Sequence, residues 1–112
     1  MKYLCNAISL QMIQNAGIAS LIFYSMLPSR IMLNKLIRTG KIKPCIGHAD
    51  TAAVIGNYLG VEIPVNRESI TLESGDVLYV AQLQGGRLPE GTKTLPEGFK
   101  FVWYAVTYQE VA

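Results

Sequence analysis

The sequence has few cysteines, one histidine and no long apolar run. Cys5 and Cys45 are its only cysteines, and they form no CxxC or comparable metal-ligand spacing. We therefore expect neither a disulfide scaffold nor a bound metal, and two free thiols are typical of a reducing compartment. With 112 residues, half of them hydrophobic, the chain is long enough to bury a core of its own. We expect a single domain over residues 1–112.

The first 27 residues contain one charged side chain, that of Lys2. Polar residues such as Asn6, Gln11 and Asn15 interrupt the apolar stretches there. No stretch approaches the roughly 18 apolar residues that a membrane span needs, and the pattern is not that of a signal peptide. We expect a soluble protein of the cytoplasm, or of the host cytoplasm if the gene is viral, with no membrane partner and no cofactor.

The formal net charge is +2, from ten basic and eight acidic residues that are scattered along the chain. A protein that coats long nucleic acid neutralises many phosphates with lysine and arginine, which requires a larger and more concentrated positive charge. Long nucleic acid is therefore not an expected partner. A small anionic ligand fits this charge better.

Apolar periodicity predicts the secondary structure. We expect strands at 3–7, 20–27, 68–72, 77–83 and 101–109. Pro28 opens a helix that Gly40 ends, a basic loop covers 39–47, and a second helix begins between His48 and Thr51 and ends at Gly60. The turn 74–76 predicts a hairpin of strands 68–72 and 77–83, and the second of these, apolar on both faces, is expected to be central. The fold class is α/β: one domain whose sheet of about five strands is flanked by two or three helices.

His48 is the single histidine and lies between a glycine and the first turn of the second predicted helix. Free backbone N–H groups at a helix start attract anions, and an imidazole gains or loses a proton near neutral pH. A phosphate and a proton donor can therefore meet at this position. The alternative is a histidine that caps the helix or packs in the core.

Two charged residues, Arg87 and Glu90, lie in a stretch rich in glycine and proline at 84–98. Loops of this length are often functional. Arginine can hold a phosphate through two parallel N–H bonds, and glutamate can orient a hydroxyl or accept its proton. The alternative is a solvated ion pair of little energetic value.

Three further polar residues follow or begin predicted strands. Asn6 and Ser9 follow the first strand and can hydrogen-bond a base or a phosphate, and Arg67 adds a positive charge before strand 68–72. Each is equally suited to a cap or an ordinary surface position.

Four segments together resemble a known family. They are NAISLQM at 6–12, IGHADTAAVIGNYLG at 46–60, VNRESI at 65–70 and VAQLQGGRLPEG at 80–91. The sequence is similar to the ring nucleases of viruses and prophages, anti-CRISPR proteins that act against type III systems and were formerly an uncharacterised domain family of archaeal viruses. The resemblance implies a homodimer that binds cyclic tetra-adenylate under a flexible lid. It also implies cleavage to linear di-adenylates with 2′,3′-cyclic phosphate ends.

The resemblance also assigns residues by position. It makes His48 the catalytic histidine, Arg87 the arginine that holds a phosphate and Glu90 the glutamate beside it. The ligand-binding residues that it implies are Asn6, Ser9, Arg67 and Gln82, together with Arg87.

The position two after the histidine departs from the family pattern. In the relatives it is often a hydroxyl residue, whereas here it is Asp50. Because a carboxylate suits a helix N-terminus but repels phosphate, we expect Asp50 to cap the helix and point away from the ligand.

The chemistry of the residues agrees with the implied reaction. RNA can be cut without a metal when its own 2′-hydroxyl attacks the adjacent phosphate, if the leaving oxygen is protonated and the oxyanion is stabilised. One histidine per chain leaves Glu90 as the base or the orienting group. Two alternatives to the nuclease stay open: a protein that binds the cyclic nucleotide without cutting it, and a small viral DNA-binding protein.

Overall fold

Five strands form one mixed sheet in the order β2-β5-β4-β1-β3. The computed structural model describes residues 1–24 and 29–111. Its strands are β1 (Lys2–Cys5), β2 (Gly17–Tyr24), β3 (Ile42–Pro44), β4 (Val77–Gln84) and β5 (Lys100–Glu110). Its helices are α1 (Arg30–Arg38), α2 (Ala49–Leu59) and the short 3-10 helix η1 (Leu10–Met12). Within the described ranges, no helix has the length and apolar character needed to cross a membrane.

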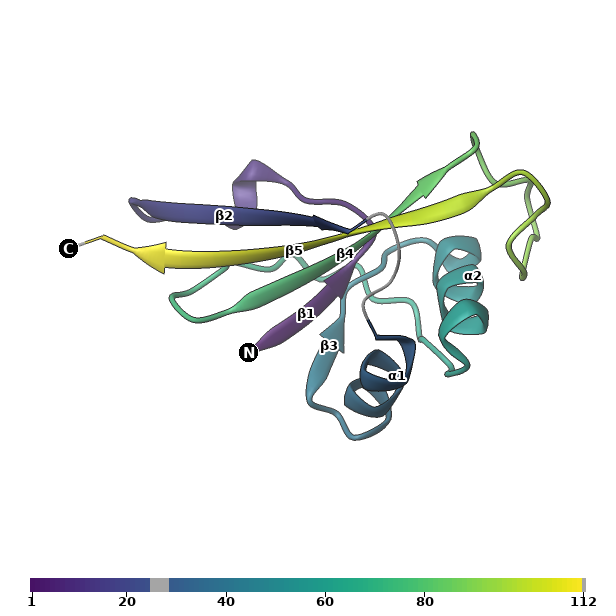
Figure 1. Ribbon diagram of the computed structural model, residues 1–112, viewed down its shortest axis with the longest axis horizontal. Helices are drawn as coiled ribbons and strands as arrows, with labels where there is room; N and C mark the ends of the chain where they lie inside the picture. The colour runs from purple at the N-terminus through teal and green to yellow at the C-terminus, as the bar shows by residue number, and fades with distance from the viewer. Residues whose placement is uncertain (25–28, 112) are drawn as a thin grey trace.

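The three strands β3, β1 and β4 are parallel to one another. β5 runs antiparallel to β4 and pairs on its other side with β2. The carboxyl ends of β3, β1 and β4 therefore meet at one edge of the sheet. The segment between β4 and β5 leaves from the same edge, and Figure 1 shows it extending beyond the sheet next to α2.

Apolar side chains cover both faces of the sheet. Figure 1 shows α1 and α2 on one side of the sheet and η1 on the other. On the helical side, Leu33, Ile55 and Trp103 belong to a buried cluster. On the opposite side, Leu78 and Val106 are buried under η1 and the irregular segment 62–73, which contributes Ile70 and Leu72. The domain has the α/β architecture that the sequence predicts.

Helix α2 forms where its apolar spacing predicts it. The residues at i, i+3 and i+7, Ala52, Ile55 and Leu59, are buried. Side-chain nitrogen Nδ2 of Asn34 in α1 donates to the carbonyls of Leu59 (2.8 Å) and Gly60 (3.0 Å). Carbonyls at the C-terminal end of a helix lack donors within the helix, so Asn34 of α1 donates to them instead. This contact ties the C-terminal end of α2 to α1.

The prediction that strand 77–83 is central is confirmed, because β4 is third of five strands. The strand predicted at 3–7 is shorter, Lys2–Cys5, and that predicted at 20–27 is Gly17–Tyr24 within the described residues, while 25–27 and Pro28 lie outside them. The basic loop predicted at 39–47 contains a strand, Ile42–Pro44. Its three residues are too few for a visible alternation, and its lysine and proline are poor strand formers.

The predicted hairpin of 68–72 with 77–83 is wrong. Residues 68–72 form no strand, although a turn follows them, with the N–H of Asp76 donating to the carbonyl of Glu73 at 2.9 Å. One edge of β4 is occupied by β1 and the other by β5, so no free edge remains for a hairpin partner. The apolar residues Ile70 and Leu72 instead pack onto the face of the sheet.

Candidate functional site

A cleft of about 1170 Å³ opens at the edge where the parallel strands end. Ligand sites in open α/β sheets commonly lie outside the carboxyl ends of the strands. The polar residues that line this cleft are Asn6, His48, Asp50, Thr51, Arg67, Gln82, Arg87 and Glu90. Six of the seven residues that the sequence analysis assigned to the site are therefore brought together.

The sheet topology explains why these residues meet. Asn6 directly follows β1, and His48 lies between β3 and α2. Gln82 lies near the carboxyl end of β4, and Arg87 and Glu90 lie in the segment that follows it. Segments that are up to 84 residues apart in sequence, from Asn6 to Glu90, thus border one cleft.

The side chain of His48 is free to contact a ligand. Its backbone is extended and occupies the N-cap position of α2, but its side chain makes no capping hydrogen bond. The residue is exposed, so it is not a packed core histidine. The first N–H groups of α2 lie beside the imidazole, and such groups with the helix dipole favour an anion at this point.

Arg67 lies against the backbone just before His48. Its Nε–H donates to the carbonyl of Gly47 at 2.8 Å. An added side chain at Gly47 would meet the Arg67 side chain at 3.0 Å, so the glycine lets the arginine lie close. Glycine at position 47 thereby places a positive charge next to His48.

Arg87 and Glu90 are exposed and line the cleft from the segment between β4 and β5. Within residues 1–24 and 29–111, the ion pairs are Met1 with Asp76 and Lys43 with Glu68, so Arg87 and Glu90 do not pair with each other. The alternative interpretation, a solvated ion pair between Arg87 and Glu90, is therefore wrong for this structure. Both side chains are available to a ligand.

Asp50 does not point away from the cleft as expected; it lines it. Its carboxylate accepts a hydrogen bond from the N–H of Gly91 at 2.9 Å. The expectation failed because the partner of the carboxylate is 41 positions away, in the segment between β4 and β5. Thr51 was not singled out from the sequence, and it lines the cleft at the first turn of α2.

Ser9 lies outside this cleft. Its hydroxyl accepts a hydrogen bond from the N–H of Gln11 at 3.3 Å and so caps η1. It borders a neighbouring hollow of about 630 Å³ that shares only Asn6 with the main cleft. The capping role that the sequence analysis gave as an alternative is the one seen.

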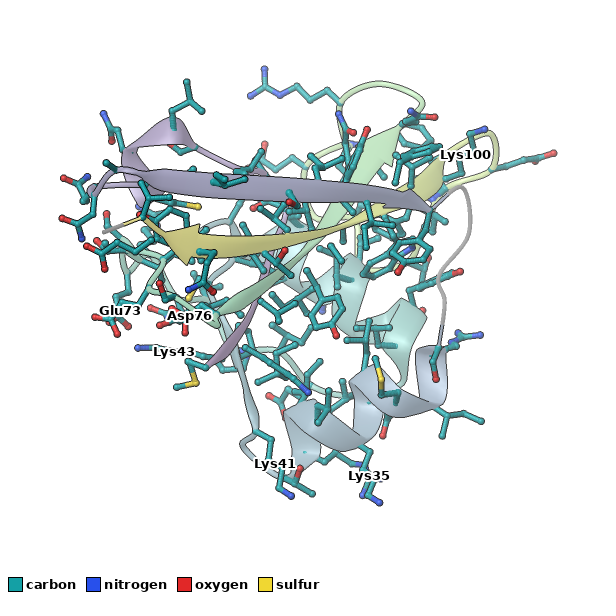
Figure 2. All side chains as sticks on the ribbon, turned by 60° about the vertical axis from the view of Figure 1, so that its left-hand side comes forward. Lys35, Lys41, Lys43, Glu73, Asp76 and Lys100 are labelled. Atoms are coloured by element: carbon teal, nitrogen blue, oxygen red, sulfur yellow. The ribbon has the colours of Figure 1, made fainter. Side chains whose placement is uncertain are left out.

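The other charges of the domain lie at separate places on its surface. Figure 2 shows Lys35 and Lys41 near α1, Lys43 on another side and Lys100 near the start of β5. Lys43 pairs with Glu68 at 2.6 Å, a hydrogen bond that raises the pKa of the lysine and lowers that of the glutamate. These lysines do not converge on one basic face.

Cys5 ends β1, and Cys45 directly follows the neighbouring strand β3. Cys5 is buried, and desolvation raises the pKa of its thiol to about 12. Cys45 is half-buried, and burial raises its pKa as well. Among the described residues, no three His, Cys, Asp or Glu side chains are grouped so as to hold a metal ion.

Comparisons with known proteins identify relatives of this domain. A family model described as STIV B116-like matches residues 2–105. Among solved structures, B116 of Sulfolobus turreted icosahedral virus has the same fold: the match has a TM-score of 0.79 and covers 95% of this chain and 97% of that one, at 22% sequence identity. A search of curated proteins finds no match.

Proposed function

This chain belongs to the STIV B116-like family, a family of viral proteins, and from that premise we propose that it is a ring nuclease that cuts cyclic tetra-adenylate. The proposed products are linear di-adenylates with 2′,3′-cyclic phosphate ends, formed without a metal ion. Loss of the ring would antagonise type III CRISPR signalling in the host cytoplasm. The proposed enzyme is a homodimer.

The observation that carries the proposal is the convergence of one histidine, two arginines and one glutamate in a single cleft. His48, Arg67, Arg87 and Glu90 all border it. The imidazole can donate a proton, the guanidinium groups can hold phosphate charge, and the carboxylate can accept a proton. Asn6 and Gln82 add amide groups that can hydrogen-bond a base.

The dimensions of the cleft suit a ligand larger than one nucleotide. Its volume of about 1170 Å³ is above the range of about 300–1,000 Å³ that is common for small-molecule sites. Two arginines at its walls and the N-terminus of α2 provide several separate places for phosphates. A cyclic oligonucleotide has phosphates spaced around a ring, which this arrangement can match.

The groups at the cleft support a reaction that uses the substrate's own 2′-hydroxyl. In the proposed step the ribose 2′-oxygen forms a bond to the adjacent phosphorus while the bond from phosphorus to the 5′-oxygen breaks. Glu90 accepts the proton of the 2′-hydroxyl, and the protonated imidazole of His48 gives a proton to the departing 5′-oxygen. Arg87 stabilises the added charge on the phosphoryl oxygens. The nucleophile belongs to the substrate, so no activated water is required.

The dimer contact is proposed on the sheet face opposite the helices. Leu21 and Phe23 of β2 pair with Val106 and Tyr104 of β5, which belong to the cluster on that face, and paired residues share a face. Leu21 and Phe23 are 53% and 54% exposed. Gln82 lies four positions after Leu78 of the same cluster in β4, so its side chain faces the same side of the sheet. A two-fold partner on this face would cover the apolar residues and extend the cleft.

A matched pair of substitutions tests this contact. Phe23→Glu should convert the dimer to a monomer in sedimentation, because it places a charge in the buried contact. Ile22→Glu changes the adjacent residue, 51% exposed but on the helical face, and should leave the dimer intact. Equal sedimentation of both variants as dimers would refute this interface.

The function itself is tested by incubation with cyclic tetra-adenylate in the presence of EDTA. Linear di-adenylate with a 2′,3′-cyclic phosphate is the expected product. His48→Ala should lower the rate by about 10²- to 10⁴-fold while the ring still binds, since a general acid contributes to the transition state more than to binding. An all-2′-deoxy ring should bind and survive. Binding without cleavage by the unaltered protein would refute the nuclease. Cleavage of the deoxy ring would instead refute the attack by the 2′-hydroxyl, because the nucleophile would then have to be a water molecule.

Binding to duplex DNA is the other outcome to be measured. A DNA-binding protein would show affinity that falls steeply with salt. The separate positions of the labelled lysines in Figure 2 favour a local anion site over such a surface. Tight duplex binding without any affinity for the ring would overturn the proposal.

A further inference from the structure

The segment between β4 and β5 is held to α2 at one residue, Asp50. The carboxylate of Asp50 accepts the N–H of Gly91 at 2.9 Å. In the part of the chain that the structure describes, residues 86–98 make one other hydrogen bond to a residue outside the segment, the local turn in which the N–H of Phe99 donates to the carbonyl of Pro96. The side chains of Leu88 and Leu95, both in this segment, pack against the core on the helical side of the sheet. The contact at Asp50 therefore holds Gly91 and its neighbour Glu90, both of which line the cleft, against α2.

A tight turn presents Gly91 to this carboxylate. Both the backbone N–H and the hydroxyl of Thr92 donate to the carbonyl of Pro89. Gly91 has a φ of +80°, which suits the third residue of a type II turn and which other residues rarely adopt. Glu90 is the second residue of the same turn. Fixing the N–H of Gly91 therefore also fixes the backbone of Glu90.

The location of Asp50 calls for an explanation, because a carboxylate repels phosphate in a cleft with two arginines. It lies in the first turn of α2, where the helix dipole stabilises a negative charge. Such a carboxylate is a strong acceptor for a backbone N–H. It lies two residues from His48 and binds a residue four positions from Arg87. The contact thus joins the first turn of α2, beside His48, to the segment that contains Arg87 and Glu90.

We propose that Asp50 is a positioning residue that latches the segment 84–98 onto the first turn of α2 and so sets Arg87 and Glu90 relative to His48. The latch is a property of the free protein. Its effect on cleavage rests on the proposed function.

Hydrogen exchange of the free protein tests the latch without any substrate. In Asp50→Ala, the amide of Gly91 should exchange about tenfold faster, because it loses a charged hydrogen-bond acceptor. Asp50→Asn keeps an acceptor oxygen and should fall between Asp50→Ala and the unaltered protein. Glu97→Ala removes an exposed carboxylate from the same segment and serves as the control with unchanged exchange. Amides of β4 and β5 report on the whole fold and should stay protected.

Kinetics then test the consequence for the site. Asp50→Ala should lower kcat for the cyclic tetra-adenylate by about tenfold with a smaller change in KM, and Asp50→Asn should restore part of the rate. Equal Gly91 exchange in Asp50→Ala and the unaltered protein would overturn the latch, as would faster exchange throughout β4 and β5. If the unaltered protein cuts no ring, the proposed function fails, while the exchange of Gly91 still decides the latch.

Discussion

A methyl group added at Gly47 tests how the site holds Arg67. In Gly47→Ala the new Cβ would lie 3.0 Å from Cγ of Arg67 and 3.6 Å from its Cα. Ordinary carbon contacts lie at about 3.5–4.0 Å, so only the Cγ contact is too short. Gly47 is not among the glycines with positive φ, so alanine can adopt its backbone conformation. The strain therefore comes from one side chain and not from the backbone.

The expected magnitude combines two opposing contributions. Displacing Arg67 weakens the hydrogen bond from its Nε–H to the carbonyl of Gly47, 2.8 Å long and exposed, a loss of about 1 kcal/mol. Replacing glycine by alanine restricts the unfolded chain and stabilises the fold by about 0.4–1 kcal/mol. Gly47→Ala alone should therefore change the free energy of unfolding little. In an Arg67→Ala background the short contact is absent, and the same substitution should stabilise.

A double-mutant cycle in urea measures this difference. We expect Gly47→Ala to stabilise the Arg67→Ala protein by about 0.5 kcal/mol and to couple to Arg67 by about 1 kcal/mol. Gly47→Ala should also weaken binding of the cyclic ring, but less than Arg67→Ala does, because it displaces the charge that Arg67→Ala removes. Additive effects within about 0.3 kcal/mol would refute the reasoning, since they would show that the glycine and the arginine act independently.

Two further predictions concern single residues. Arg87→Ala should weaken ring binding and slow cleavage together, with only partial recovery in Arg87→Lys, because a guanidinium holds phosphate through two bonds; unchanged binding and turnover would contradict this role. Cys5, whose pKa burial raises to about 12, should resist iodoacetamide at pH 8 in the folded protein and react after unfolding in urea, since only about 10⁻⁴ of the thiol is ionised. Because the pKa of Cys5 is raised from 9.0, its contribution to stability is complete below pH 9 and is lost as the pH rises toward 12. Rapid alkylation of folded Cys5 at pH 8 would show that it is not buried.

The elements with strong local signals were predictable from the sequence. Helix α2 has apolar residues at helical spacing and a terminating Gly60, and β5 is a long β-branched and aromatic run. Strand pairing was less predictable, because it depends on which edges are free. Ile70 and Leu72 alternate as in a strand, yet both edges of β4 are occupied by β1 and β5. Apolar alternation shows that two residues are buried on one side, but not whether they lie in a sheet or on its face.

The candidate site was predictable in its residues but not in its geometry. His48 and Arg87 could be singled out by their neighbours in the sequence, a helix start and a loop rich in glycine. Their meeting depends on the parallel order of β3, β1 and β4, and β3 was not predicted at all. Ser9 lies close to Asn6 in sequence, but η1 turns the chain toward the neighbouring hollow.

Asp50 shows where reasoning from charge alone reaches its limit. Electrostatic repulsion between a carboxylate and a phosphate predicts that Asp50 faces away from the ligand. That prediction fails because the carboxylate has a partner. The N–H of Gly91 and the start of α2 both stabilise its charge. A negative group can then remain in the cleft and hold the wall that contains Glu90 and Arg87. The position of this carboxylate thus depends on its hydrogen-bond partner as much as on the charge of the ligand that is proposed for the cleft.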